Sequence, residues 1–124
     1  MRKVLLASML GAAMAMTALP ASAQDIIGKG SFTGASNHIT TGGVHVTATA
    51  VELQSDFSLD GAPDPKVGFG NDGVYDDATT FAVLESNTGA QTYQLPEGID
   101  PSAYNEVYIW CEKFAVPLGV AKLQ

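Results

Sequence analysis

The sequence has very few of the residues that carry chemistry or join chains covalently: one cysteine, one tryptophan and two histidines among 124 residues. A single cysteine, Cys111, excludes a disulfide within the chain and dithiol exchange of the thioredoxin type, because both need a second thiol. The Cys-x-x-Cys-His pattern that attaches a c-type haem covalently is absent. The Gly-x-Ser-x-Gly turn that positions a serine nucleophile is absent as well. The sequence therefore gives no support to a serine hydrolase or to a redox protein with paired thiols.

Basic residues are also scarce, and two of the six lie at the N-terminal end. Arg2 and Lys3 precede an apolar run, residues 4–19, and the small-x-small sequence Ala-Ser-Ala ends at Ala23. This is the pattern of a secretory signal peptide that is cleaved after Ala23, so that the mature chain begins at Gln24. The run is shorter than the roughly 20 residues of a membrane-spanning helix. We therefore expect a periplasmic or secreted protein without stable membrane insertion.

Cleavage would leave a strongly acidic chain. Four lysines remain against thirteen Asp and Glu residues, a formal charge of −9, compared with −7 for the whole sequence. A field of this sign does not attract nucleic acid or anionic lipid, which argues against both as partners bound through general charge. The excess of acid is explained either by solubility or by a basic partner or divalent cation, and composition leaves these alternatives open.

Turn residues punctuate the mature chain about every ten residues, and no helical pattern separates them. Between the turns lie short runs of β-branched and aromatic residues, of which residues 44–53 (VHVTATAVEL) alternate most clearly. The one candidate helical turn begins where Asp100 stands as a cap before Pro101. The mature chain shows no linker and no internal repeat. We expect a signal peptide over residues 1–23 and one all-β domain over residues 24–124, an antiparallel β-sandwich or a small barrel-like domain.

The last strand, within VYIWCEKFAV, is predicted to be central in its sheet. Successive side chains of a strand point to opposite faces, so Cys111 shares a face with Ile109, while Trp110 faces the other side with Tyr108. Both faces are largely apolar up to Cys111, as expected for a strand that is covered on both sides. Cys111 then lies at the margin of an apolar face, with Lys113 as the next side chain on that side.

Two interpretations of Cys111 are open at this point. Free cysteine is often a small buried hydrophobic residue, and the alternation alone favours this interpretation. An unpaired thiol in an oxidising compartment is a liability unless it is hidden or used, which favours a function. A nucleophilic thiolate needs cationic neighbours or a helix N-terminus, and this acidic chain offers only Lys113 close by. A bound metal would stabilise the thiolate without such neighbours.

The two histidines, His38 and His45, flank the turn sequence Thr-Thr-Gly-Gly. If all four turn residues form a hairpin loop, the two imidazoles face each other directly. If only the glycines turn the chain, the imidazoles become diagonal neighbours on one face. Either register predicts histidines within reach of each other, as a shared metal site would need. The alternative is an exposed hairpin whose threonines and histidines point to water.

Acidic residues crowd two loops, and they also have two interpretations. Oxygen ligands from such loops suit calcium, but the spacing of an EF-hand loop is absent. Solvated turns are the other interpretation, and the spacing favours them. The residues are Asp56, Asp60 and Asp64 in the first loop and Asn71, Asp72, Asp76 and Asp77 in the second.

The C-terminal half, residues 89–123, carries a longer pattern: Gly-x-Gln-x-Tyr-x-Leu-Pro, then Ile-Asp, a Tyr, Val-x-Ile-Trp-Cys, Phe-x-Val and Ala-x-Leu. This pattern resembles the DM-thirteen domain, a small electron-transfer domain often found beside DOMON and cytochrome b domains. The N-terminal half fits more loosely, through Gly30 and through His38 with the glycine turn that follows it. The loop after residue 57 departs from the family, because Ala62 splits a Gly-Pro-Asp run and Pro65 replaces an apolar residue.

The resemblance implies that Cys111 has a redox function, either as a bare thiol or as a ligand to a prosthetic group such as haem. Trp110, Tyr104 and Tyr108 are then expected to frame the thiol, and His38 to assist it. The implied partner is a redox protein or an exported cytochrome. The alternative is a non-catalytic extracytoplasmic binding or adhesion module in which Cys111 is inert core, and a third interpretation is a calcium-stabilised surface domain.

We expect the protein to be recovered from the periplasm or the medium with Gln24 as its first residue, because the signal sequence directs export and is then removed. Intact-mass measurement on protein from an exporting host checks this expectation. A species that retains Met1 and stays in the membrane fraction would contradict it.

Overall fold

The short apolar runs of the sequence become strands, and nearly every one is closed by a turn. The computed structural model describes residues 24–124, so the expected signal peptide lies outside the described residues and stays a prediction. The strands are β1 (Ile26–Gly34), β2 (Thr40–Thr41), β3 (Gly43–Thr47), β4 (Ala50–Leu53), β5 (Ser58–Leu59), β6 (Pro65–Asn71), β7 (Val74–Asp76), β8 (Ala82–Val83), β9 (Gln91–Gln94), β10 (Glu106–Cys111) and β11 (Val116–Lys122). Two 3₁₀ turns, η1 (Asp77–Thr79) and η2 (Pro101–Ala103), complete the regular structure of this part of the chain.

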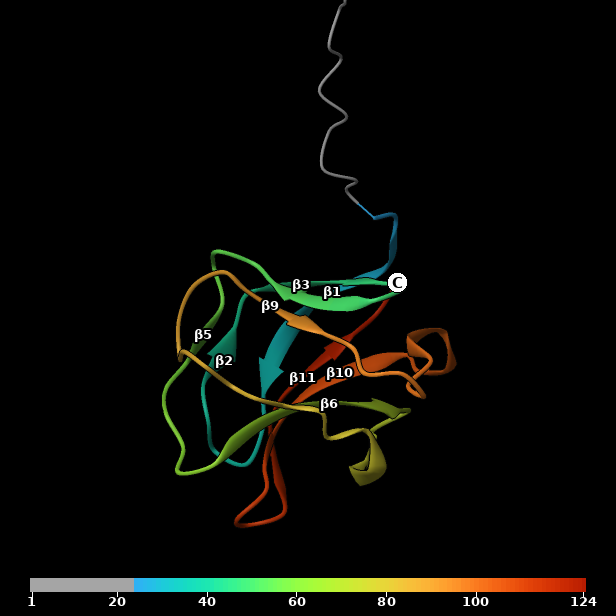
Figure 1. Cartoon of the computed structure of the whole chain (residues 1–124). Coiled ribbons are helices and arrows are strands. Elements are labelled where there is room, and N and C mark those ends of the chain that lie inside the picture. The colour runs from blue at the N-terminus through green and yellow to red at the C-terminus, as the bar shows by residue number, and fades with distance from the viewer. Residues whose placement is uncertain (1–23) are drawn as a thin grey trace, which may run out of the picture.

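One antiparallel sheet contains nine of these strands, and it curls into a half-barrel (Figure 1). The strand order is β7-β6-β10-β11-β1-β3-β4-β9, and β8 pairs with β6. β2 and β5 form a separate two-stranded sheet. Within residues 24–124, no helix has the length and apolar character that crossing a bilayer requires.

The core fills the inside of the curl. Val107 and Ile109 of β10 are fully buried, and they face Phe69 and Val67 on β6, which are buried as completely. Burial of each such side chain contributes about 1.5–3 kcal/mol to stability. The other buried members of this cluster are Phe32, Val44, Val46, Val51, Leu53, Phe57, Leu59, Leu84, Tyr93, Cys111, Leu118 and Ala121.

The structure confirms the predicted all-β antiparallel class, in its barrel-like form. The central position of the strand that ends in Cys111 is confirmed as well, because β10 pairs with β6 on one side and with β11 on the other. The expectation that it is the last strand is wrong, because the chain turns at residues 112–115 and continues as β11. The helical turn is present as η2, whose cap Asp100 accepts a hydrogen bond from the Ser102 N–H. Residues 44–53, by contrast, do not form one strand. Their chain folds back between Thr47 and Ala50, so that β3 and β4 pair as a hairpin.

β1 carries the sheet from one wall of the half-barrel to the other. Residues 32–34 of β1 pair with β11, whereas its earlier residues pair with β3. At the crossing, a Cβ on Gly30 would stand 2.1 Å from the carbonyl oxygen of Lys122. Glycine is therefore the residue that lets the two backbones approach closely enough for the sheet to curl.

Gly30→Ala is expected to lower the free energy of unfolding by about 1–3 kcal/mol, because the added methyl group meets backbone that must move. Gly28→Ala is the matched control on the same strand, since its Cβ would meet only the Leu123 side chain, at 3.3 Å. Urea unfolding of both variants provides the comparison. Equal losses in the two variants would show that the close approach at Gly30 does not control stability.

Candidate functional site

Cys111 is the last residue of β10, and its side chain belongs to the core. Its Cα partners are Pro65 on β6 and Val116 on β11. Only 1% of the residue is exposed, and it shares the buried cluster with Ile109, as the alternation predicts. Four exposed residues, 112–115, follow it and turn the chain into β11. The thiol is therefore enclosed, yet it lies one position from a solvent-exposed turn.

The loop between β1 and β2, which contains His38, and the turn between β10 and β11, which follows Cys111, both lie in the lower part of Figure 1. The Nδ1 atom of His38 lies 2.8 Å from Oδ1 of Asp60, and the Ile39 N–H donates to the other carboxylate oxygen at 3.0 Å. The pKa of the Asp60 carboxyl is lowered by these contacts, first by the Ile39 N–H and then by His38. The loop that contains Asp60, between β5 and β6, also reaches the end of β10, because the Glu112 N–H donates to the Asp64 carbonyl at 3.1 Å.

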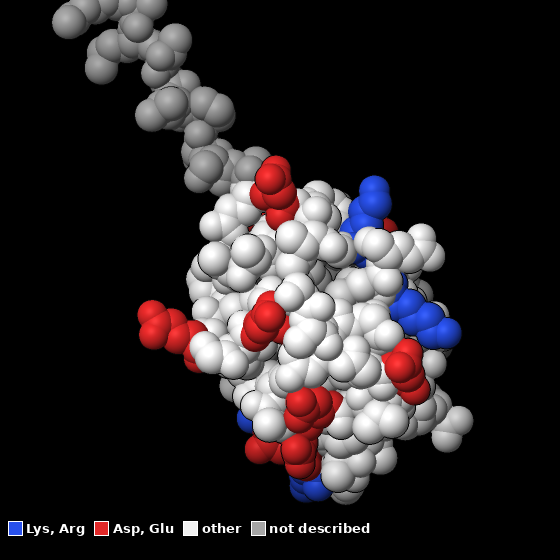
Figure 2. All heavy atoms as spheres, turned by 90° about the vertical axis from the view of Figure 1, so that its right-hand side faces the viewer, with Lys and Arg blue, Asp and Glu red and all other residues white. Residues whose placement is uncertain are grey.

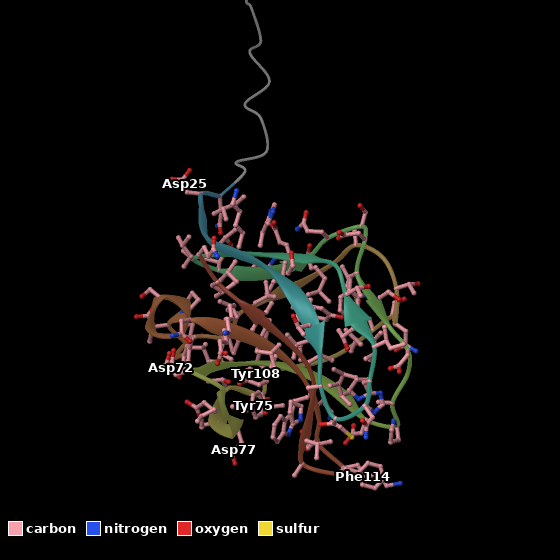
Figure 3. The ribbon with its side chains drawn as sticks, turned by 180° about the vertical axis from the view of Figure 1, so that it is seen from behind. Asp25, Asp72, Tyr75, Asp77, Tyr108 and Phe114 are labelled. Carbon is pink, nitrogen blue, oxygen red and sulfur yellow. The ribbon has the colours of Figure 1, made fainter. Side chains whose placement is uncertain are left out.

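Trp110 lies on the opposite face of β10 from Cys111. Its ring stacks on Tyr75 with the centroids 4.1 Å apart and the planes 15° from parallel. Tyr108 lies beside Tyr75, at 5.2 Å, on the same outer face (Figure 3). Gly68 of β6 makes room for this aromatic cluster, since a Cβ there would stand 2.5 Å from the Tyr75 hydroxyl. Trp110 and Tyr108 therefore both pack against Tyr75 on the outer face of the sheet. Neither ring surrounds the thiol.

Tyr104 lies beyond the other end of β10. Its ring stacks on Phe69 at 5.4 Å, and its hydroxyl donates to Asp76 at 3.0 Å. Tyr104 and Cys111 are seven positions apart in the chain, which corresponds to roughly 20 Å along an extended strand. Of the residues expected near the thiol, Tyr104 is thus remote, Trp110 is adjacent in sequence but lies on the outer face, and His38 lies in a loop at the same end of the half-barrel.

The expected pairing of His38 with His45 is wrong. β2 pairs with β5, whereas β3 pairs with β1 and β4. The Cα partners of His45 are therefore Lys29 and Glu52. The chain turns at Gly42, whose φ of 100° favours glycine, and this turn sends β2 and β3 into different sheets. The separation follows from strand pairings with distant segments, which the local turn sequence does not encode.

The carboxylates of the two acidic loops accept hydrogen bonds from their own and neighbouring loops. Asp56 accepts from the Gly43 N–H at 2.9 Å. Asp76 accepts from the Ala78 N–H at 3.1 Å and from the Tyr104 hydroxyl. Among residues 24–124, no three His, Cys, Asp or Glu side chains lie close enough together to hold a metal ion. In these contacts the acids stabilise turns.

A groove of about 940 Å³ lies on the outer face of the sheet, where β1 passes from β11 to β3. Its polar lining comes from alternate positions of β1, namely Lys29, Ser31 and Thr33, and from Lys122 and His45 on the flanking strands. Sequence reasoning did not find it. The alternation in KGSFT indicates an outward polar face, but only the pairing of β1 with β3 and β11 brings together the residues that line the groove.

Glu106 and Tyr108 also line this groove. Glu106 is only 3% exposed, and its Oε1 accepts hydrogen bonds from the Gly73 N–H at 2.8 Å and from the Tyr108 hydroxyl at 3.2 Å. Burial, then the charge of Glu106 and the hydrogen bond to it, together raise the pKa of Tyr108 to about 12. The groove thus has a buried carboxylate and a phenol that stays protonated at neutral pH.

Comparison with known proteins gives one match. The family model described as electron transfer DM13 matches residues 31–123, a stretch that includes Cys111. Neither a curated protein nor a solved structure matches the chain.

The raised pKa of Tyr108 predicts a loss of stability in alkali. Its pKa of about 12 in the folded protein exceeds the ordinary tyrosine value of 10.0, so its contribution to stability is complete below pH 10 and falls as the pH rises toward 12. Tyrosinate absorbance should show a late-titrating group that Tyr108→Phe removes. Glu106→Gln should lower the pKa of Tyr108, because it removes the nearby negative charge. A Tyr108 that titrates at the ordinary value in the folded protein would contradict the burial and hydrogen bonding described here.

Proposed function

We propose, since this chain belongs to the DM13 electron-transfer family, that it is an exported electron-transfer module with Cys111 as its redox-active residue. Family membership supports a role in electron transfer in general. The assignment to Cys111 rests on one observation: the sole thiol of the chain lies at the end of a central strand, beside an exposed turn. Export rests on the N-terminal sequence.

A bare thiol is better supported here than a haem ligand. Cys111 is enclosed in the core, and it does not line the groove on the outer face. A porphyrin needs an open cavity beside its axial ligand, so the residues as they stand do not fit one.

Access to the thiol depends on the turn at residues 112–115. All four turn residues are exposed, and the last of them, Ala115, has a φ of 52° in the left-handed region. Cys111 and Val116 form the final pair of the β10–β11 ladder. Ladder ends open at a lower free-energy cost than ladder centres, and so this turn can expose the thiol while the core stays folded. The redox partner, a protein or an exported cytochrome, would then meet Cys111 at this end of the half-barrel.

Cys111 in the folded protein is expected to react with a mild peroxide. The sulfur gains one oxygen atom as the O–O bond breaks and water leaves, so that the thiol is oxidised by two electrons to a sulfenic acid. Trapping by a sulfenic-acid reagent and mass spectrometry measure the rate. Oxidation no faster than global unfolding would assign Cys111 to the core alone.

Val116→Ala is expected to speed this oxidation by about tenfold if it weakens the ladder end by about 1.4 kcal/mol. Val120→Ala is the matched control, because Val120 is equally half-buried on the same strand but faces Tyr108.

Added haem tests the alternative, in which Cys111 is a ligand. A haem absorption band in the native protein that Cys111→Ala and Cys111→Ser both abolish, while the fold survives, would replace the thiol proposal with ligation.

A further inference from the structure

The groove on the outer face concentrates positive charge on an acidic molecule. Figure 2 shows acidic side chains scattered over one face, with the few basic ones near its edges. The mature chain has four lysines, and the groove is lined by two of them, Lys29 and Lys122. The one carboxylate that lines it is that of Glu106, and a further acid, Glu52, is the Cα partner of His45 at its border.

Lys29 and Lys122 lie on adjacent strands, and their ammonium groups are available to a ligand. The Lys29 N–H donates to the Gln124 carbonyl, and the adjoining Gly30 lies against the Lys122 carbonyl, so both side chains arise where the two strands meet. His45 is the direct cross-strand partner of Lys29. Within residues 24–124 the ion pairs of lysines involve Lys66, and neither groove lysine takes part in one.

The inner wall of the groove offers hydrogen bonds to neutral groups. Both bonds to Glu106 end on Oε1, which leaves Oε2 as an acceptor for a ligand hydroxyl. Ser31 and Thr33 line the same groove with hydroxyl groups. Because a carboxylate is repelled by Glu106, an anionic ligand would place its charge on the lysines and its hydroxyl groups toward the glutamate.

We propose that this groove binds a small organic anion that carries both carboxylate and hydroxyl groups. Its volume, about 940 Å³, lies in the range of sites that hold small organic ligands. The same chemistry is found in free hydroxy acids and in the sugar acids of acidic oligosaccharides. The groove is open along the sheet surface, and so both sources are compatible with its shape. This site is separate from Cys111 and does not rest on the electron-transfer proposal.

Calorimetric titration of the purified protein at low salt with citrate, and separately with an oligogalacturonate, tests the proposal. Saturable one-to-one binding of at least one probe is expected, weakened by added salt. Citrate alone would identify a site for free hydroxy acids, and preference for the oligogalacturonate would identify a saccharide site. Retention of binding by Cys111→Ala is expected, which separates this result from any failure of the redox proposal.

The double variant Lys29→Gln/Lys122→Gln should weaken binding by about tenfold or more, whereas Lys66→Gln/Lys113→Gln makes the same charge change outside the groove and should not. Glu106→Gln should strengthen binding of succinate, which has no hydroxyl group, more than that of citrate. Circular dichroism confirms that each variant is folded. Failure of both probes to bind, or an equal loss in the two double variants, would overturn the proposal.

Discussion

The antiparallel pairing of β10 with β6 and β11 holds the candidate residues in their places. Along β10 the side chains alternate between the core and the outer face, so Ile109 and Cys111 are enclosed while Tyr108 and Trp110 pack outside. A slip of one residue in this register would exchange the two sets. It would expose the thiol and direct the Glu106 carboxylate into an apolar core, where an unpaired charge is costly. The buried partners on β6 therefore fix the chemistry of both faces at once.

The curl of the sheet is the second constraint, and it depends on glycine. β1 pairs with β11 and with β3, and Gly30 permits the close backbone approach where one pairing gives way to the other. The core lies on the inner side of this strand, and the polar groove lies on its outer side. The two pairings of β1 therefore bring together the strands that contribute to both.

The thiol and the groove are separated by the sheet itself. Cys111 lies inside, at the end near the exposed turn 112–115, whereas the groove lies outside, across β1, β3 and β11. A ligand in the groove would leave the end of the half-barrel uncovered. The aromatic cluster of Tyr75, Tyr108 and Trp110 also lies on the outer face. It therefore packs the outside of β10 while the thiol packs the inside.

The local features could be predicted from the order of the amino acids alone. The period-two alternation placed Cys111 and Ile109 on one face of a central strand and Trp110 on the other, the Asp100 cap marked η2, and the C-terminal pattern indicated the family. Which segments pair with one another is known only from the folded structure. It divided residues 44–53 into a hairpin and gave His45 the partners Lys29 and Glu52 in place of the other histidine. It also brought together the residues of β1, β3 and β11 that line the polar groove. These features depend on pairing between segments far apart in the chain, and a period-two pattern states which way a side chain points but not which strand lies beside it.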